Sequence, residues 1–141
     1  MELSGLEYDY EQMLKKVRSK IPKVASKRER LELPRIRHSV AGMRTIFHNF
    51  RDTADALNRN PHHLLKFLSR EMATAATLQE LRAIFKGKFS RQTLERLLQR
   101  YMDQFVTCPI CKLPDTKIVK ERRLTFLVCE ACGAKSSIRE L

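Results

Sequence analysis

The sequence predicts an α+β fold with a leading amphipathic helix, a small mixed central domain and a C-terminal ribbon built on four cysteines. Three observations predict it: an apolar stripe of helical spacing near the start, alternating helix and strand patterns in the middle, and two Cys-x-x-Cys pairs near the end. A chain of 141 residues has room for one ordinary domain or a few small ones. We expect four segments: residues 1–21, 22–37, 38–106 and 107–141.

The charge is unevenly distributed. The formal net charge is +12, and residues 15–37 carry ten Lys or Arg against two Glu, whereas residues 1–14 carry four acidic and no basic side chains. This excess predicts an anionic partner, nucleic acid before an acidic membrane surface. No apolar run is long enough to span a membrane, and the first residues do not resemble a signal peptide. We therefore expect a soluble cytoplasmic protein with no membrane partner.

The first segment predicts a short helix that begins near Asp9 and ends at Pro22. Its apolar residues step by three and four and form one stripe: Tyr10, Met13, Leu14, Val17 and Ile21. A basic, proline-containing linker follows at residues 22–37, which favours an extended tether that can touch RNA. Because this linker leaves the helix without a neighbour, we expect its stripe to dock in a groove of another protein. The alternative is that it packs on its own central domain.

The central segment predicts a turn at Gly42 followed by a strand, then a short helix at residues 51–59. A second helix is expected to begin at Asn60 and Pro61, an N-cap residue followed by proline at the first helical position. The pattern at Thr77–Phe89 fits either a helix or strands, and we choose strands. Ser90 then caps a helix whose apolar stripe continues to Phe105, almost reaching the first cysteine.

The last segment carries the most specific motif. Two Cys-x-x-Cys pairs, separated by seventeen residues, use every cysteine of the chain: Cys108, Cys111, Cys129 and Cys132. Four thiolates at this spacing can occupy the corners of a tetrahedron, and a zinc ion bound by four thiolates has no open position for a catalytic water. The residues between the pairs predict a hairpin with strands at 117–120 and 124–128. We expect one structural Zn²⁺; two disulfides or an iron–sulfur cluster are the alternatives.

No motif supports catalysis. The chain lacks a phosphate-binding Gly-x-x-x-x-Gly-Lys-Ser/Thr loop and a nucleophile elbow. His62 and His63 are adjacent, so they do not share a helix face, and we interpret them as exposed first-turn residues. We therefore predict that the protein is not an enzyme. Eight basic residues are candidate RNA contacts through phosphates: Arg59, Lys66, Lys86, Lys88, Lys117, Lys120, Arg122 and Arg123.

Several stretches together resemble the beta subunit of archaeal translation initiation factor 2, over nearly the whole chain. They are Tyr10-Glu11-Gln12-Met13-Leu14, Arg44-Thr45-Ile46-Phe47-His48-Asn49-Phe50, Ala56-Leu57-Asn58-Arg59-Asn60-Pro61, Leu64-Leu65-Lys66-Phe67-Leu68, Gly87-Lys88-Phe89 and the four cysteines. The central and ribbon parts also resemble the amino-terminal domain of eukaryotic initiation factor five. Lys112 departs from the pattern, because the family often has glycine after the first cysteine pair.

The resemblance implies a heterotrimer with an alpha subunit and a GTP-binding gamma subunit, which carries initiator methionyl-tRNA to the small ribosomal subunit. It implies that Tyr10, Met13, Leu14 and Val17 contact the gamma subunit, and that initiator tRNA, ribosomal RNA or both are bound. The other hypotheses are a DNA-binding transcription regulator, in which Thr53–Leu68 forms a helix-turn-helix, and an assembly scaffold whose charge serves only solubility.

Overall fold

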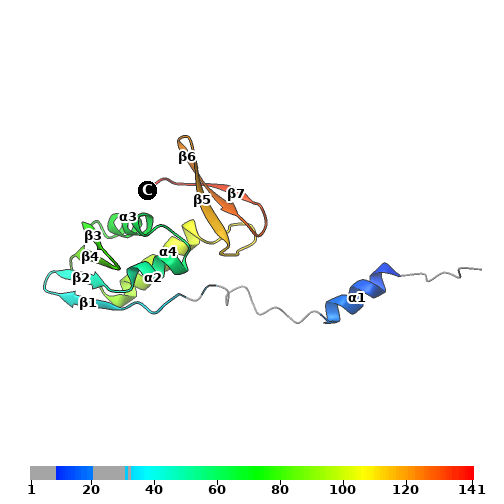
Figure 1. Ribbon diagram of the computed structural model, residues 1–141, viewed down its shortest axis with the longest axis horizontal. Helices are drawn as coiled ribbons and strands as arrows, with labels where there is room; N and C mark the ends of the chain where they lie inside the picture. Colours follow the sequence, from blue (N-terminus) through cyan, green and yellow to red (C-terminus); the bar gives the residue numbers. More distant parts are fainter. Residues whose placement is uncertain (1–8, 21–30, 32) are drawn as a thin grey trace, which may run out of the picture.

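The computed structural model describes residues 9–20, 31 and 33–141 (Figure 1). It confirms the predicted α+β class, with an N-terminal helix, a central mixed domain and a C-terminal three-stranded sheet that carries the cysteines. The helices are α1 (Tyr10–Lys20), α2 (Phe50–Ala56), α3 (Pro61–Glu71) and α4 (Arg91–Phe105). The central strands are β1 (His38–Ala41), β2 (Arg44–Phe47), β3 (Ala76–Gln79) and β4 (Arg82–Lys86), and the ribbon strands are β5 (Thr116–Glu121), β6 (Leu124–Cys129) and β7 (Lys135–Ile138).

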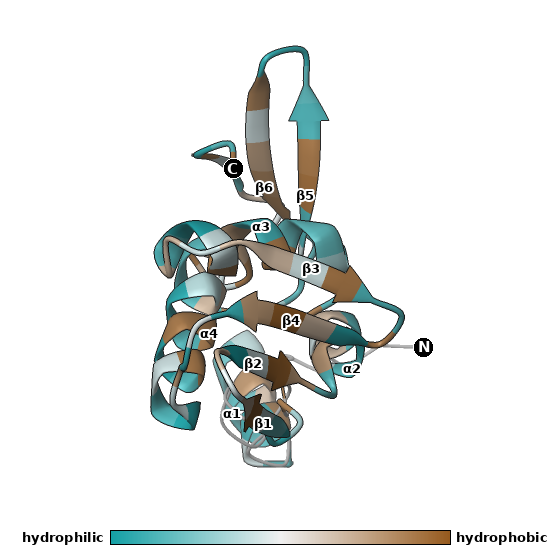
Figure 2. Ribbon diagram, turned by 90° about the vertical axis from the view of Figure 1, so that its left-hand side faces the viewer, coloured by the Kyte–Doolittle hydropathy of each residue, from teal (hydrophilic) through white to brown (hydrophobic). Residues whose placement is uncertain are grey.

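The central sheet is antiparallel, in the order β1-β2-β4-β3. Its side chains alternate between two faces, because successive residues of a strand point to opposite sides. The inner face includes the fully buried Phe47, Ala83 and Phe85. Figure 2 shows the sheet from its other face, with the helices of the central domain behind it. One face of the sheet is therefore packed against helices, and the other is open.

The core lies between the sheet and α2, α3 and α4. Its centre is aromatic: the Phe67 and Tyr101 rings lie 5.2 Å apart edge to face, and Phe67 and Phe105 lie 5.7 Å apart. Burying a large apolar side chain contributes roughly 1.5–3 kcal/mol. The predicted apolar stripe of α4 contributes to this core, since its five residues are all buried: Leu94, Leu97, Leu98, Tyr101 and Phe105.

The predicted helix starts are confirmed. The Asn60 side chain accepts a hydrogen bond from the His62 backbone N–H, and the Ser90 hydroxyl accepts one from that of Thr93. Each cap satisfies a donor that the first turn leaves unpaired. The choice of strands at residues 77–89 is also confirmed, because β3 and β4 form a hairpin there.

Two strands were not predicted. The segment His38–Ala41 forms the edge strand β1, which precedes the expected turn at Gly42, where φ is +60°. The segment Lys135–Ile138 forms β7 beside the predicted ribbon hairpin. Both strands are four residues long and contain no fully buried residue, and neither has the regular apolar alternation that identifies a strand in a sequence.

Residues 22–30 and 32 of the expected linker lie outside the described residues. Its final residues pack on the central domain: Ile36 is buried, and the Arg37 backbone N–H donates to the Asn49 side-chain oxygen at 2.8 Å. The Asn49 amide donates in turn to the Arg35 carbonyl at 2.9 Å. The chain is therefore attached to the core before β1 begins.

The leading helix α1 buries none of its residues, and Figure 1 draws it apart from the sheet and the ribbon. Tyr10 is 71%, Val17 55% and Met13 41% exposed, while Leu14 is half-buried. Ile21, the last residue of the expected stripe, lies outside the described residues. Among the residues that the structure describes, no helix has the length and apolar character needed to cross a membrane.

Candidate metal centre and the joint beside it

The structure brings the four cysteines together at the base of the ribbon. Their sulfur atoms all lie within 4.8 Å of one another, with 3.7 Å between Cys108 and Cys132 and 3.5 Å between Cys111 and Cys129. A disulfide needs about 2.05 Å between sulfurs. A tetrahedron with metal–sulfur bonds of about 2.3 Å has edges of about 3.8 Å. The four thiols therefore fit a tetrahedral metal ion and are not paired as disulfides.

Two tight turns hold the cysteines in place. After the first pair, the Lys112 N–H donates to the Cys108 carbonyl, and the Cys108 N–H donates to that of Leu113, both at 3.0 Å. The second turn repeats this arrangement, with the Gly133 N–H donating to the Cys129 carbonyl at 3.0 Å. Gly133 has φ +73°, a left-handed conformation that glycine adopts without strain, while Lys112 has φ +60° without the freedom of glycine.

The electrostatics of the cluster favour a cation. Burial raises the pKa of the Cys108 thiol, but backbone N–H groups of Cys111 and Ile110 and the thiol groups of Cys132 and Cys111 more than offset this and hold that pKa at about 6. Backbone hydrogen bonding from Ala134 lowers the pKa of Cys132, yet burial and the three other cysteines raise it to about 12. One cysteine of the cluster therefore ionises readily, but all four can be thiolates together only when a positive charge compensates them.

Beside this cluster, Arg59 joins the ribbon to the central domain. It lies in the turn between α2 and α3 and is 7% exposed. Its Nε and Nη2 donate to the Phe105 carbonyl at 3.1 and 2.9 Å, and its Nη1 donates to the Thr116 carbonyl at 2.7 Å. The remaining donors reach the Asn58 carbonyl and the Thr116 hydroxyl at 2.8 and 2.6 Å. The interpretation of Arg59 as an RNA contact was wrong, because protein acceptors occupy its whole guanidinium.

The acceptors of Arg59 explain why a charge is tolerated in this position. Phe105 is the last residue of α4, and the carbonyl end of a helix carries a partial negative charge. The Thr116 hydroxyl also donates to the Val106 carbonyl, so a single buried threonine connects β5, α4 and Arg59. Burial lowers the pKa of Arg59 from its ordinary value. We conclude that Arg59 fixes the start of the ribbon against the end of α4.

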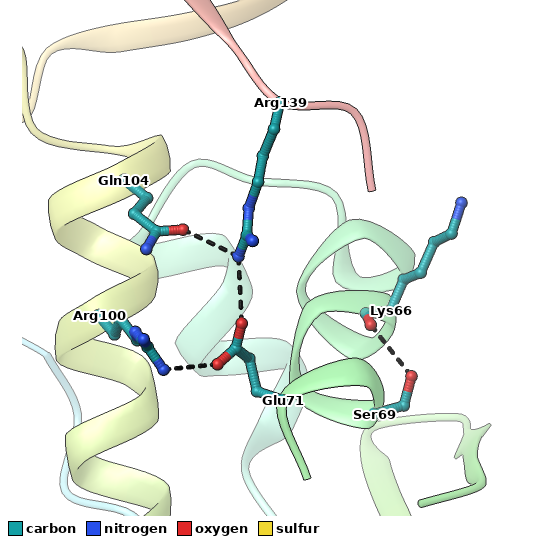
Figure 3. Close-up of polar contacts among 6 residues, drawn as sticks. All are labelled: Lys66, Ser69, Glu71, Arg100, Gln104 and Arg139. Carbon is teal, nitrogen blue, oxygen red and sulfur yellow. Dashed lines mark hydrogen bonds and ion pairs between the residues drawn. The ribbon is translucent and has the colours of Figure 1, made fainter. Parts of the chain in front are cut away.

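A second link between the two parts lies on the surface (Figure 3). Glu71 at the end of α3 accepts from Arg100 of α4 at 2.6 Å and from Arg139 of the C-terminal segment at 3.1 Å. Arg139 also donates to the Gln104 side chain at 3.1 Å. Exposed ion pairs stabilise little individually. The partly buried Ile138 and Leu141 also pack on the core. These apolar contacts and the polar contacts of Arg139 together place the C-terminal segment across α3 and α4.

His63 differs from expectation in the same region. An exposed side chain was expected, but its Nδ1 is 2.8 Å from the Tyr101 hydroxyl and its ring packs 5.1 Å from that of Phe105. Burial, and secondarily the charges of Arg59 and Lys66, lower the pKa of His63. His62 is exposed, as expected.

The seven other candidate RNA contacts are exposed, and they lie on several different elements. Lys117 and Lys120, on the ribbon, form ion pairs with Glu130 and Glu140. Within the part of the chain that the structure describes, the other five form no ion pair. They lie on α3, at the end of β4, in the loop after β4 and in the ribbon turn: Lys66, Lys86, Lys88, Arg122 and Arg123. Sequence reasoning therefore identified exposed charge without identifying a surface.

Comparison with known proteins agrees with this architecture. Residues 22–135 match the family model described as the domain found in initiation factors 2B and 5. The chain is 40% identical over 134 residues to translation initiation factor 2 subunit beta of Methanococcus vannielii, covering 95% of this chain and 97% of that protein. It is 39% identical over 136 residues to the subunit of the same name in Methanopyrus kandleri, covering 96% of this chain and 99% of that one.

The longer Methanosarcina mazei protein of the same name is 40% identical over 133 residues, which cover 94% of this chain and 66% of that protein. A mixed central domain followed by a four-cysteine ribbon thus defines a member of this class of initiation-factor domains. Within that class, the chain belongs to the family of translation initiation factor 2 beta subunits. This family is not enzymatic, so the prediction that the protein is not an enzyme is confirmed.

Proposed function

We propose that this chain acts as one subunit of a heterotrimeric initiation factor, with a GTP-binding gamma subunit and an alpha subunit, in the cytoplasm. In this role it helps to deliver initiator methionyl-tRNA to the small ribosomal subunit. The observation that carries the proposal is the similarity to archaeal beta subunits over nearly the whole chain, α1 included. Residues 1–21 dock on the partner, 22–37 connect, 38–106 form the central domain and 107–141 the ribbon.

The exposed stripe of α1 supports the docking role. A helix of eleven residues is marginal in water by itself, and this one buries no side chain. Tyr10, Met13 and Val17 present large apolar surfaces on one face, with the half-buried Leu14 between them. Burying such side chains contributes roughly 1.5–3 kcal/mol each, which exceeds the cost of ordering a short helix. The stripe is therefore the surface by which the chain binds the gamma subunit.

The metal of the ribbon is Zn²⁺ in this proposal. Four thiolates select zinc over harder cations, and the observed sulfur separations support tetrahedral coordination. The ligands would be Cys108, Cys111, Cys129 and Cys132. A ribbon of about 35 residues cannot bury enough surface to fold alone, so the ion would supply its stability and no chemistry.

The net positive charge supports binding to initiator tRNA, ribosomal RNA or both. The retained candidates for phosphate contact are Lys66, Lys86, Lys88, Arg122 and Arg123, with Lys117 and Lys120 available if their surface ion pairs open. Affinity should be salt-dependent and nearly independent of base sequence.

The test is recovery of the tagged chain, with its bound partners, from native cytosol. We expect it to recover a GTP-binding subunit and methionyl-tRNA, and to lose both when the stripe of α1 is removed. Recovery of chromosomal DNA instead would favour the transcription regulator. That alternative is weakened by α3, because His63, in the first turn of the supposed recognition helix, faces Tyr101 and Phe105. Recovery of neither would leave a scaffold role.

A further inference from the structure

The open face of the central sheet carries a feature that the proposed function does not use. Its outward side chains follow from the strand register: Ser39, Ala41, Arg44, Ile46, Thr77, Gln79, Arg82, Ile84 and Lys86. Figure 2 shows this face toward the viewer, and no element of the described chain covers it there. Every charged residue among these nine is basic. Glu80, in the turn between β3 and β4, is the acidic residue at the border.

The basic side chains occupy the two ends of the face, and its centre is apolar. Arg44 lies directly opposite Lys86 in the pairing of β2 with β4, and Ile46 lies opposite Ile84. Arg82 stands at the other end of β4, opposite Gln79. Lys86 lies four positions further along the strand, or about 13 Å at roughly 3.3 Å per residue. Side chains spaced in this way can each contact a different phosphate, so they fit successive groups of an extended polyanion.

The pairing of Arg44 with Lys86 is unfavourable in the isolated chain. Like charges directly opposite each other in a sheet are destabilising. Within the described part of the chain, neither these two residues nor Arg82 forms an ion pair, whereas the ribbon residues Lys117 and Lys135 do. The open face therefore has uncompensated positive charge at positions where an anion would relieve the repulsion.

The same face is hollowed between its basic end and its apolar centre. A shallow depression of about 760 Å³ is lined by Arg44 and Lys86 and by Ile46 and Ile84, with the 72% exposed Met43 beside it. A nucleobase or ribose can rest on the isoleucines while neighbouring phosphates reach the basic side chains. A double helix presents phosphates on its outside, so an apolar floor fits unpaired nucleotides better.

We propose that the open face formed by Arg44, Ile46, Arg82, Ile84 and Lys86 binds a single-stranded segment of RNA through its phosphates. This inference deepens the proposed role in initiation and rests on its RNA-binding part. The nine outward positions include no aromatic residue that could stack on bases, so recognition is by charge and shape and is nearly blind to sequence. A period-two pattern, Arg44-x-Ile46 and Arg82-x-Ile84-x-Lys86, is the sequence signal that marks this face.

Methyl spectra of the intact, zinc-loaded chain test the location. With isoleucine methyl groups labelled, a mixed-sequence single-stranded RNA of about 12 nucleotides should shift the signals of Ile46 and Ile84. The signals of Ile118 and Ile138, in the ribbon, should stay within error. Shifts confined to the ribbon isoleucines would overturn the assignment to the sheet.

Matched charge variants test the energetics. The triple change Arg44→Gln, Arg82→Gln and Lys86→Gln removes three charges from the open face. The control Arg51→Gln, Arg70→Gln and Arg96→Gln removes three from exposed positions on α2, α3 and α4. Each lost phosphate contact lowers the slope of log affinity against log salt by about 0.7, so the sheet variant should lose about 2 in slope and bind at least tenfold more weakly. The control variant should show a much smaller decrease in both the salt slope and the affinity.

Two outcomes of these RNA titrations would also overturn the inference, and only the second contradicts the proposed RNA binding as well. If the wild-type chain binds RNA and the two triple variants weaken equally, the charge acts only in sum and this face is not a site. If the wild-type chain binds no RNA even at low salt, the RNA-binding part of the proposed function fails with it. Melting temperatures equal to wild type or higher are expected for the sheet variant, since the like-charge pair is gone.

Discussion

Replacing Arg59 with methionine should destabilise the protein, because this residue holds the ribbon against the central domain. The change leaves the buried carbonyls of Phe105 and Thr116 without their charged donor. A buried acceptor left unsatisfied costs about 1–3 kcal/mol. Methionine recovers some packing and removes a desolvated charge, which offsets part of this cost. We expect a net loss of about 2–4 kcal/mol in the free energy of unfolding.

Urea titration of the zinc-loaded chain measures this loss. The control is Arg51→Met, which removes the same side chain from an exposed position on α2 and should change the free energy by less than about 0.5 kcal/mol. RNA affinity of folded Arg59→Met at low urea should stay near that of the wild type. If Arg59→Met were as stable as Arg51→Met but bound RNA more weakly, Arg59 would be a surface contact, and the joint described above would be wrong.

Three further changes probe the ribbon and the core beside it. Elemental analysis should find one zinc per wild-type chain and none in Cys129→Ser. This variant should also unfold the ribbon, while the helical circular dichroism signal of the central domain is retained. Lys112→Gly should stabilise the metal-bound form by about 0.5–1 kcal/mol by relieving a left-handed residue, measured as resistance to a chelator; Lys112→Val should do the opposite. His63 has a lowered pKa, so its stabilising contribution is present above its ordinary value of 6.5 and is lost as the pH falls through the folded pKa. The stability difference between wild type and His63→Gln should therefore shrink between about pH 7.5 and pH 5, while His62→Gln should track the wild type.

Much of the fold could be predicted because its signals are local. The Asn60-Pro61 and Ser90 caps, the stripe of α4 and the cysteine spacing each depend on residues close in sequence. The strands β1 and β7 could not be found in this way. They are short edge strands, and their pairing is set by the neighbours β2 and β6 and not by their own composition.

The candidate site shows the same difference between local and long-range signals. The cysteine cluster was predictable, since four cysteines at fixed spacing allow few arrangements. The role of Arg59 was not, because its acceptors lie 46 and 57 residues further along the chain. A sequence does not show whether a basic side chain faces solvent or forms buried hydrogen bonds between two parts of the chain. Only the tertiary structure distinguishes these two roles.

The most direct test of the central claim, that α1 attaches this chain to a GTP-binding subunit, is the binding affinity of a stripe variant for that purified subunit. Calorimetric titration of Tyr10→Ala with Leu14→Ala should show a loss of two orders of magnitude or more, at about 1.4 kcal/mol per tenfold. The control Gln12→Ala with Ser19→Ala, on the opposite face of α1, should bind as the wild type does. The melting temperature of the isolated chain should not change for either variant. Unchanged affinity together with a lower melting temperature for the stripe variant would contradict the account, since α1 would then pack on its own central domain.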